Sequence, residues 1–535
     1  MFQSQQLLPY LKYVIPFALA FIVLKFVIVS IYRVTWHPLA KYPGPWTAKF
    51  TDWYGAYHSA RGQLHIKTWQ GHQKWGSIVR QGPNKVVLNS VEGLQDVYHS
   101  KNVQKSKGYL SMVPSPGVYN IHTAVDKSLH KHKRKVIGQG LSDQCMRAFE
   151  PTMLDKIDIF VKKLATASTD NQSEGNWSIP VNMTQSCKHL GYDVMGEYGF
   201  GQSFEMQSKP DNHFLLDAVE ATSHRSGVYG QYPGLAKYKL EKLLYPKSAW
   251  MRERYLSLMT DLVEWRLKEA RDSKNDLFSF IIDAKDEETG RGFTHKELWS
   301  ESRFLLVAGA DTSSTALSAA FFYLSMNPVC YDKLASEVRN TFSSASEIRT
   351  GPKLASCHYL RACIDEALRM SPPAGGTLWR EVCEGGVVVD DAYIPAGCDV
   401  GCSVYAVHHN EKYFPDSYKY KPERWIAEDT PKEIIELARL AFNPFSLGPR
   451  GCAGKTMAYM ELCNTLGRAI WYMDFRRADG PLGLVGAGSS DDKNGRNRVD
   501  EFQLQDHLTS SHDGPYIQFS VRKGFEKGLE SVSIN

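Results

Sequence analysis

The sequence predicts a single, mainly α-helical globule with small β-sheets, placed behind an N-terminal transmembrane helix. An apolar stretch opens the chain, most of the middle has helical periodicity, and short β-type runs occur near residues 77–89 and in the last fifth. With 535 residues, 43% hydrophobic and 23% charged, the chain has an ordinary globular composition and can bury a large core. Neither an internal repeat nor a domain boundary is evident after residue 46.

Residues 7–32 predict an uncleaved membrane anchor, which we assign to residues 1–33. A bilayer-spanning helix needs about 20 mostly apolar residues. Lys12 and Lys25 interrupt the stretch, but long lysine side chains can reach the headgroups. The charge-free segment 13–24 fits a signal peptide on length alone. However, no basic segment precedes it and no small-residue cleavage site follows, so we favour the anchor.

The charges around this anchor predict its orientation. Arg33, Lys41 and Lys49 follow the apolar stretch, and nothing basic precedes Lys12. The positive-inside rule therefore places the C-terminal bulk in the cytosol, behind a single membrane pass. Three Asn-x-Ser/Thr sequons would stay unmodified in that topology, and they lie at Asn171, Asn176 and Asn182.

A proline-rich hinge, residues 34–46, follows the anchor, and residues 47–535 form the globule. Proline fixes φ and keeps the preceding residue extended, so the hinge is expected to be a stiff, non-helical arm. Residues 77–81 and 85–89 flank Gly-Pro-Asn and predict a β-hairpin. The glycine-rich, charged segment 479–500 predicts a surface loop.

Charge and cysteine usage exclude several classes of function. The net charge of +5 is too small to indicate a nucleic-acid partner. The ten cysteines are scattered without a C-x-x-C pair, which gives no support to a zinc ribbon or a thioredoxin-like redox site. This scatter suits a reducing compartment better than a disulfide framework.

Residues 294–326 predict the longest helix of the globule. Thr294 and Glu297 form a capping box, and Asn327 followed by proline ends the helix. The middle of the segment is apolar on nearly every face, which indicates burial.

Two polar residues interrupt the apolar middle of this helix, in the sequence Ala-Gly-Ala-Asp-Thr. Asp311 and Thr312 are costly there unless they find partners. The Thr312 hydroxyl can bond back to the carbonyl of Ala308 and bend the helix. A neighbouring cation facing Asp311 would be a structural explanation. A functional role for the acid and the hydroxyl, in moving protons together with water, is the alternative, and the loop described next favours it.

The segment 442–454 is the most informative in the chain. It places one cysteine in a glycine-rich turn directly before a helical run. Glycines allow backbone to approach a flat cofactor, and N–H groups at a helix start favour a thiolate. A lone cysteine is often a small core residue, but five spaced positions favour a cofactor ligand. In the order Phe-x-x-Gly-x-Arg-x-Cys-x-Gly they are Phe445, Gly448, Arg450, Cys452 and Gly454.

This loop resembles the haem-thiolate loop of the cytochrome P450 family, and the resemblance covers nearly the whole chain. It implies a cytochrome P450-like catalytic domain over residues 47–535, with haem b (iron protoporphyrin IX) as cofactor and Cys452 as the axial ligand of its iron. Phe445 and Gly454 would be cofactor-binding residues. A thiolate ligand favours O–O cleavage. By the same resemblance, Thr312 and Asp311 form the proton relay.

The resemblance also assigns several charged residues. Glu366 and Arg369 share one face of a helix, and with Arg424 they would form a buried, structural salt-bridge triad that holds the cysteine loop. Cations should converge on the two haem propionates. The implied propionate ligands are Arg450, Arg380, Arg134 and His130. Many relatives carry tryptophan at the place of His130, so a solvated residue in a lysine-rich run stays an alternative for it.

Electrons would come from a separate protein, because the chain after Cys452 is too short for a fused flavin module. The helix 127–136 carries four lysines and is expected to lie on the cysteine side of the haem, where NADPH-cytochrome P450 reductase docks. These lysines are Lys127, Lys131, Lys133 and Lys135. The resulting expectation is an endoplasmic reticulum membrane protein with its catalytic domain in the cytosol.

The expected activity is a monooxygenase that inserts one oxygen atom from O2 into an apolar small molecule by hydroxylation or epoxidation. The amino-acid sequences of the segments near residues 37–45 and 77–85 are similar to those of filamentous-fungal enzymes. Many of these enzymes act in secondary metabolite biosynthesis. Oxidative coupling or rearrangement on the same cofactor, and a non-catalytic haem-binding membrane protein, remain alternatives. By analogy, the pocket walls are residues 109–119, 304–315, 374–377 and 507–512.

Overall fold

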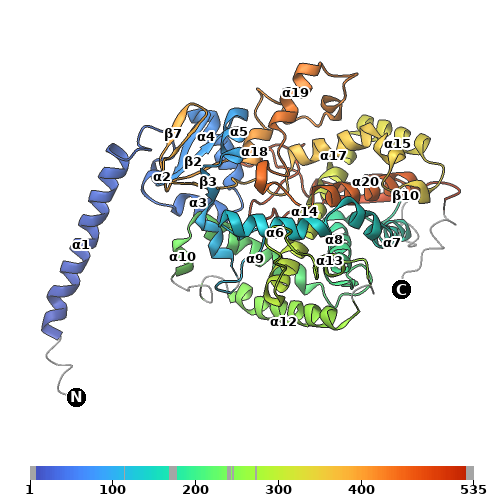
Figure 1. The fold of residues 1–535 in the computed structure, drawn as a ribbon. Helices are drawn as coiled ribbons and strands as arrows, with labels where there is room; N and C mark the ends of the chain where they lie inside the picture. The colour runs from blue at the N-terminus through green and yellow to red at the C-terminus, as the bar shows by residue number, and fades with distance from the viewer. Residues whose placement is uncertain are drawn as a thin grey trace.

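The computed structural model describes residues 8–113, 115–167, 177–237, 243, 246–270 and 274–525. The described part is mainly helical with three small sheets, which confirms the predicted fold class (Figure 1). Its helices are α1 (Leu8–Thr35), α2 (Trp46–Phe50), α3 (Trp53–Ala60), α4 (Leu64–Trp75), α5 (Val91–His99), α6 (Lys127–Gly140), α7 (Asp143–Thr166), α8 (Met183–Phe200), α9 (Phe214–Gln231), α10 (Gly234–Lys237), α12 (Pro246–Lys268), α13 (Leu277–Ile281), α14 (His295–Met326), α15 (Pro328–Thr341), α16 (Pro352–Ala355), α17 (His358–Met370), α18 (Val404–His408), α19 (Lys432–Ala441) and α20 (Lys455–Tyr472).

The strands gather mostly beside the N-terminal helices. The largest sheet runs in the order β1 (Ile78–Gly82), β2 (Lys85–Leu88), β8 (Asp399–Cys402), β5 (Arg380–Val382), β3 (Val103–Lys105). A second sheet has the order β4 (Val181–Asn182), β10 (Tyr516–Val521), β9 (Met473–Arg477), and β6 (Val387–Val389) pairs with β7 (Ala392–Ile394). The antiparallel pairing of β1 with β2 confirms the predicted hairpin.

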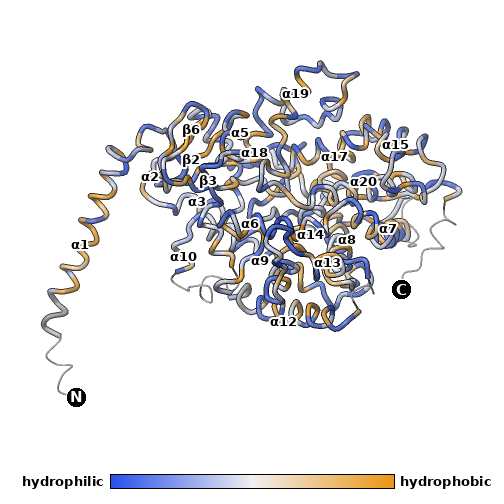
Figure 2. Tube along the Cα trace, in the orientation of Figure 1, coloured by the Kyte–Doolittle hydropathy of each residue, from blue (hydrophilic) through white to orange (hydrophobic). Residues whose placement is uncertain are grey.

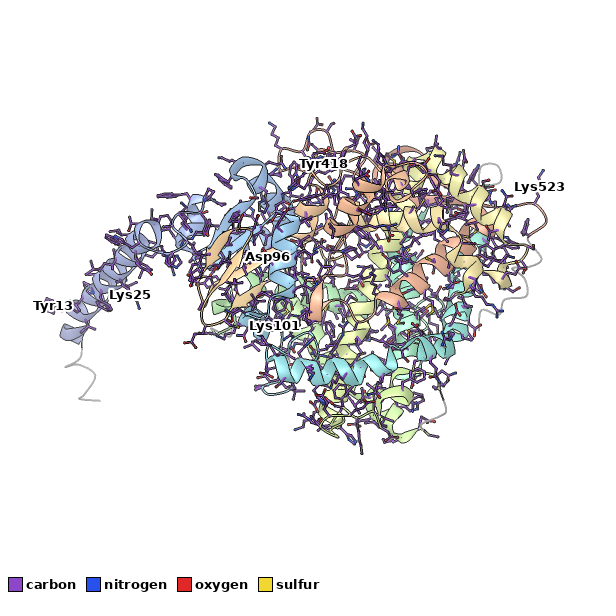
Figure 3. All side chains as sticks on the ribbon, turned by 45° about the horizontal axis from the view of Figure 1, so that its top comes forward. Tyr13, Lys25, Asp96, Lys101, Tyr418 and Lys523 are labelled. Carbon is purple, nitrogen blue, oxygen red and sulfur yellow. The ribbon has the colours of Figure 1, made fainter. Side chains whose placement is uncertain are left out.

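The first helix stands apart from the globule (Figure 1), and from Tyr13 onward most of its residues are apolar (Figure 2). From Tyr13 to Thr35 it is long and apolar enough to cross a membrane, and its side chains are unburied in the protein. Figure 3 shows Tyr13 and Lys25 projecting from α1, clear of the other elements. The helix α14 passes the same test of length and composition, but it is largely buried in the globule. The first helix is therefore the one suited to a membrane anchor.

The chain between α1 and α2 is non-helical and packs against the sheet. Leu39 and Tyr42 are buried beside β2 and β8. The fully buried guanidinium of Arg80 in β1 donates to the carbonyl of Arg33, near the end of α1, at 2.8 Å. The same side chain donates to Pro83 O at 2.8 Å. These bonds tie the end of α1 to the first hairpin.

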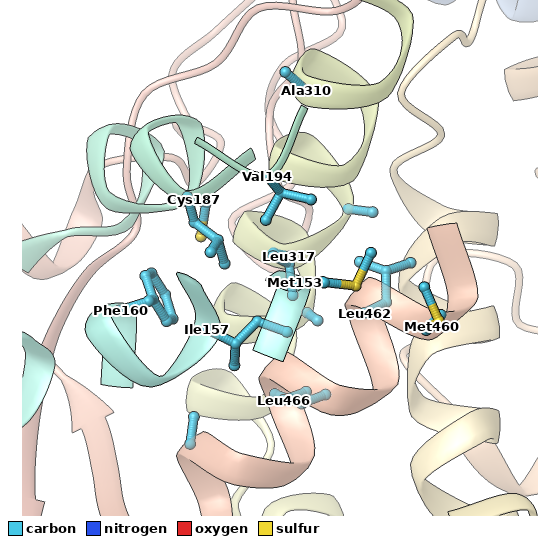
Figure 4. Close-up of a cluster of buried hydrophobic side chains, with 14 of the residues drawn as sticks. Met153, Ile157, Phe160, Cys187, Val194, Ala310, Leu317, Met460, Leu462 and Leu466 are labelled. Carbon is cyan, nitrogen blue, oxygen red and sulfur yellow. The ribbon is translucent and has the colours of Figure 1, made fainter. Parts of the chain in front are cut away.

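The long helix α14 forms the centre of the globule. Thr294 and Glu297 make the predicted capping box, and the helix ends at Met326 before the cap residue Asn327. Helices α8 and α20 pack against it, and α7 packs against both of these helices, as the cluster in Figure 4 shows. The close approach of α8 to α14 depends on Gly191, because a Cβ there would lie 2.8 Å from the carbonyl oxygen of Ala310. One face of α14 is thus sealed by α8, and another is left to line the cavity described below.

Candidate active site

A cavity of about 360 Å³ lies between α14, α6 and the cysteine loop. Among the residues predicted from sequence, seven line it: Thr312, Cys452, Arg450, Arg134, His130, Phe445 and Gly454. Asp311 and Arg380 do not line it. The structure therefore brings most of the predicted site together from segments far apart in the chain.

The cysteine loop is held by its own backbone. Phe445 accepts a hydrogen bond from the Cys452 N–H at 2.7 Å, which closes the turn before α20. The 3-10 turn Gly448–Arg450 begins at a residue with φ of +67°. A Cβ at Gly448 would also lie 2.1 Å from the carbonyl oxygen of Tyr98. Both the backbone conformation and the close approach to α5 therefore require glycine at position 448.

Cys452 is the only exposed cysteine of the ten, all of which lie in the described residues. Its side chain is open to the cavity although it lies deep in the protein. This burial raises the pKa of the Cys452 thiol, while the Gly454 backbone, Arg134 and Lys455 act to lower it. A thiol that coordinates a metal ion is deprotonated outright. A metal ion bound by Cys452 would therefore outweigh the cost of burying the thiolate.

Arginines reach the cavity from two sides of the loop. Arg450 donates to the carbonyls of Ala124 and Val125, the latter at 2.9 Å, and so ties the loop to the segment before α6. Arg134 on α6 donates to the carbonyl of Gly451. Burial first, and then Arg380, lower the pKa of Arg450 to about 10. Arg450 is therefore both part of the loop's support and part of the cavity wall.

His130 lines the cavity one helical turn before Arg134. Its pKa is lowered to about 3 by burial, Arg450, Lys105 and Arg134, so the ring is neutral at pH 7. The structure does not place it on the solvated face of α6, since the side chain is buried. A neutral imidazole can still donate one hydrogen bond to an anion.

Sequence reasoning missed several polar residues of this cavity, among them Lys105 and His122. Lys105 lies at the end of β3, paired in register with Arg380 of β5, and its ammonium lies 3.2 Å from Nδ1 of His122. His122 stacks on Phe304 of α14. Each lies in a short segment without a recognisable motif. Only the pairing of β3 with β5, which sequence did not predict, brings Lys105 to the arginines.

Among the described residues, no salt bridge joins Lys105, Arg134 or Arg450 to a carboxylate, although the side chain of Glu461 also lines the cavity. Burial and the nearby Arg380 and Arg450 lower the pKa of Lys105 well below its usual value. Burial, Lys105 and the same two arginines likewise lower the pKa of His122. Buried charges are normally paired or neutralised. Two carboxylates entering the cavity would supply the missing counter-charge. The residues present therefore fit a flat, largely apolar group that carries two propionates, beside a cysteine ligand.

On α14, Thr312 and its neighbour Asp311 face different surroundings. The Thr312 hydroxyl donates to the carbonyl of Ala308 at 2.6 Å, which confirms the predicted back-bond. Asp311 is buried away from the cavity wall, where it accepts hydrogen bonds from the hydroxyls of Tyr192 at 3.1 Å and Thr509 at 3.0 Å. Thr509 itself lines the cavity, so one hydroxyl separates the Asp311 carboxylate from it.

The structure brings Glu366, Arg369 and Arg424 together in a buried cluster. Arg369 donates to both oxygens of Glu366, at 2.9 and 3.0 Å, and Arg424 donates to Oε1 at 3.0 Å. Trp425 adds an indole N–H to Oε2 at 3.0 Å. Burial opposes ionisation of Glu366, but the two arginines hold its pKa below the usual value. The cluster ties α17 to the 3-10 turn Pro422–Trp425.

The four lysines of α6, which were expected to face a docking reductase, do not all lie free on the surface. Lys133 is fully buried and lies 3.2 Å from Glu297 and 3.1 Å from Glu301 of α14. Lys131 pairs with Glu288, and Lys135 pairs with Asp286 and Glu288. The spacing of the lysines in α6 does not predict these acidic partners, because the partners belong to elements far away in the sequence.

The walls of the cavity include residues from each of the expected segments. Tyr109, Phe304, Ala374 and Thr509 line it, and a second, smaller cavity of about 60 Å³ shares Tyr109 and Ala374.

The segment 479–500 lies largely exposed, as predicted. Of the three sequons, Asn182 caps α8 and bonds to Tyr516, while Asn171 and Asn176 lie outside the described residues.

Comparisons with known proteins agree with this geometry. The cytochrome P450 family model matches residues 43–476. The chain is 39% identical to the cytochrome P450 monooxygenase apf7 of Gibberella fujikuroi over 93% of this chain and 96% of that protein. It is 40% identical to AKT7 of Alternaria alternata (91% and 94%) and 37% identical to atnE of Emericella nidulans (94% and 95%), both also cytochrome P450 monooxygenases. The chain belongs to the cytochrome P450 family and is an oxidoreductase with haem as its cofactor.

Proposed function

We propose that this protein is a membrane-anchored monooxygenase that inserts one oxygen atom from O2 into an apolar organic substrate by hydroxylation or epoxidation. The observation that carries the proposal is the shared cavity of Cys452 and Thr312, which cations line on one side. The proposed division of the chain is an anchor (residues 1–33), a hinge (34–46) and a catalytic domain (47–535).

Haem held through Cys452 would supply thiolate-ligated iron and, with it, the chemistry of oxygen activation. Arg450, Arg134 and His130, with Arg380 behind them, would bind the propionates. Lys105 belongs to the same set, because it lines the same part of the wall and is paired in register with Arg380. Phe445 and Gly454 would flank the cysteine. A guanidinium binds a carboxylate through two parallel hydrogen bonds, which fixes the orientation of the group that carries it.

Thr312 would position protons beside the reacting oxygen. Its own hydrogen is committed to Ala308, so its oxygen is left to accept a hydrogen bond from water in the cavity. Asp311 would supply protons through Thr509, whose hydroxyl bridges the carboxylate and the cavity wall. Burial raises the pKa of Asp311, and Lys188 opposes that rise. The raised pKa makes it easier for the Asp311 carboxylate to take up a proton.

The proposed substrate is apolar, because the α14 wall of the cavity is built from Phe304, Leu305, Val307 and Ala308. The fungal monooxygenases that the chain resembles support a role in secondary metabolite biosynthesis. Electrons would come from NADPH through a separate cytochrome P450 reductase. Lys127 and Lys131 are the exposed lysines of α6 that such an acidic partner would meet.

The proposed location is the endoplasmic reticulum membrane, with one pass through the bilayer and the catalytic domain in the cytosol. The exposed apolar surface of α1 supports the pass, and the basic residues after it support the orientation. Glycosidase treatment of the protein from microsomes should leave its electrophoretic mobility unchanged. Sugar attached at any of the three sequons would show the opposite orientation.

The test begins with the carbon monoxide difference spectrum of the reduced protein beside a Cys452→Ala variant. A strongly red-shifted Soret band in the wild type, absent from the variant, is expected for thiolate-ligated haem. Candidate substrates are then incubated with reductase and NADPH. A product mass raised by one oxygen supports insertion, whereas a loss of two hydrogens shows oxidative coupling. Absence of reductase-dependent NADPH consumption across substrates would indicate a non-catalytic haem protein.

A further inference from the structure

The smaller, second cavity forms a side chamber of about 60 Å³ beside the active cavity that contains Cys452. The two cavities share part of their walls, namely Tyr109, Ala374, Leu378 and Leu508. The rest of the side chamber is built from α9, from the segment before β5 and from residues 106–112. One water needs roughly 10–15 Å³ of such space, so the side chamber has room for a small group at one end of a longer ligand.

The side chamber differs from the active cavity in its charge. Within the described part of the chain its lining includes no aspartate, glutamate, lysine or arginine, whereas cations and Glu461 line the active cavity. Its own polar side chains are neutral ones: Ser106, Ser226, Gln231, Thr377, Trp379 and His507. Burial and the nearby His224 lower the pKa of His507 to about 4, so its ring is neutral at pH 7. A charged group would find no counter-charge in the side chamber, which therefore favours a neutral one.

The indole of Trp379 is a buried donor of this lining without a partner. The residue is 4% exposed, and no hydrogen bond reaches its Nε1 atom among the described residues. Its ring packs with Tyr109, and the Lys85 ammonium lies 5.8 Å from the ring centroid. That ammonium is itself a donor, held by Asp52 and by the carbonyl of Gln231, so it cannot accept the indole hydrogen.

Helix α9 contributes a hydroxyl and open space to the same chamber. Ser226 is buried and lines it, and Gly230 lies one helical turn further along. A Cβ at Gly230 would meet only the Cε atom of Met112, at 3.3 Å, outside the helix's own backbone. The glycine therefore leaves space that a larger side chain would fill.

We propose that the side chamber binds a neutral hydrogen-bond acceptor, such as an amide or ester carbonyl, at the end of the substrate remote from the reacting carbon. Trp379 is the specificity-determining donor. Buried polar groups are normally hydrogen-bonded, and an indole can only donate, so the partner that Trp379 lacks is an acceptor. The substrate is then apolar where it reacts and polar, but uncharged, at its far end. Turnover of such a substrate rests on the proposed monooxygenase function, but its binding needs only haem at Cys452.

Ligands anchored on the iron test this specificity without turnover. The probes are 1-alkylimidazoles, because the free imidazole nitrogen ligates ferric haem and shifts its Soret band while the alkyl chain extends through the cavity. The far end of each chain carries a carboxamide, a carboxylate or a methyl group, in series of increasing chain length. Spectral titration gives the dissociation constant of each probe. Imidazole itself is too short to reach the side chamber and reports on the haem site alone.

The informative variant is Trp379→Phe, which keeps an aromatic ring and removes the N–H. Trp250→Phe, at an exposed position of α12, is the matched control. In the wild type the carboxamide probe should bind most tightly once its chain reaches the side chamber. The ratio of carboxamide to methyl affinity should fall about tenfold in Trp379→Phe, near the upper end for one neutral hydrogen bond, and stay constant in Trp250→Phe. An unchanged ratio in Trp379→Phe overturns the proposal, and so does tightest binding of the carboxylate probe.

A second variant covers the case in which Trp379→Phe does not fold or does not retain haem. Gly230→Leu fills the side chamber from α9, so it should abolish the preference for the carboxamide and leave the dissociation constant of imidazole unchanged. A preference that survives in Gly230→Leu overturns the proposal. Incubation of candidate substrates with reductase and NADPH is a separate test. Probes that bind as expected, with no oxygenated product from any substrate, would overturn the monooxygenase function and leave the acceptor site standing.

Discussion

The Nε2 atom of His408 accepts a hydrogen bond from the backbone N–H of Asn443 at 3.0 Å. The other ring nitrogen, Nδ1, lies 3.1 Å from the carbonyl oxygen of Arg369 and must donate to it. Because Nε2 accepts, the imidazole is neutral, and burial lowers its pKa to about 3. His408 thus connects the Glu366–Arg369 pair directly to the start of the cysteine loop.

Replacing His408 by phenylalanine should loosen the cysteine loop. The Asn443 N–H and the Arg369 carbonyl would both lose a partner in a buried setting, and each unsatisfied group costs about 1–3 kcal/mol. We expect a smaller red-shifted carbon monoxide band per protein and a lower melting temperature. His358→Phe, at an exposed position of α17, is the control and should change neither. An unaltered spectrum in His408→Phe would contradict this connection.

The same histidine should make stability depend on pH. Its folded pKa of about 3 lies below the ordinary value of 6.5, so the unfolded chain binds the extra proton as the pH falls. Its contribution is complete above pH 6.5 and is lost as the pH drops toward the folded value, at about 1.4 kcal/mol per pH unit. Urea unfolding at pH 7, 6 and 5 should therefore show a steeper loss in the wild type than in His408→Phe. Parallel curves would contradict the neutral form.

The buried triad should be far more sensitive than a surface pair on the same helix. Arg369→Ala leaves Glu366 short of a counter-charge and should cost about 3–5 kcal/mol, with loss of bound haem. Arg361 and Asp365 form a partly exposed pair on α17, and Arg361→Ala should cost about 1 kcal/mol, because it also removes the guanidinium from the ring of Tyr459. Denaturant titration and haem content measure both. Equal losses in the two variants would show that burial does not decide the effect.

Thr312→Ala should separate oxygen consumption from product formation. The variant keeps the helix but removes the hydroxyl at the cavity wall, so we expect about 100-fold less product, with more hydrogen peroxide released. Thr315 makes an equivalent back-bond to Asp311 O at 2.8 Å but does not line the cavity, which makes Thr315→Ala the matched control. Peroxide and product are measured per NADPH consumed. A control variant as uncoupled as Thr312→Ala would indicate a helix defect.

Lys105→Met should weaken haem retention although no sequence motif marks the residue. Methionine preserves most of the side-chain volume and removes the charge, so the loss measures the attraction of the ammonium for a propionate. We expect about tenfold faster transfer of haem to an acceptor protein, equivalent to about 1.4 kcal/mol. Lys101→Met, at an exposed position nearby, should transfer haem at the wild-type rate. If both variants retain haem equally well, Lys105 does not bind the cofactor.

Many structural features of this protein follow from residues that lie close together in the sequence. The capping box of Thr294 and Glu297, the back-bond of Thr312 and the first hairpin depend on residues within a few positions of one another, so spacing alone predicts them. The cysteine loop belongs to the same class, since its turn closes between Phe445 and Cys452. Sequence also predicted the pairing of Glu366 with Arg369, because residues three apart share a helix face.

Short-range sterics, capping and hydrophobic length act within one segment, so the apolar first helix, the central helix and the cysteine loop could all be predicted from local patterns. Which distant side chains meet depends on tertiary packing. It buries Lys133 against Glu301, turns Asp311 toward Tyr192, and brings Lys105 and Glu461 to the cavity. Helical and strand periods tell which residues share a face, but the partner that covers each face comes from elsewhere in the chain, and that partner sets the charge and burial of the site.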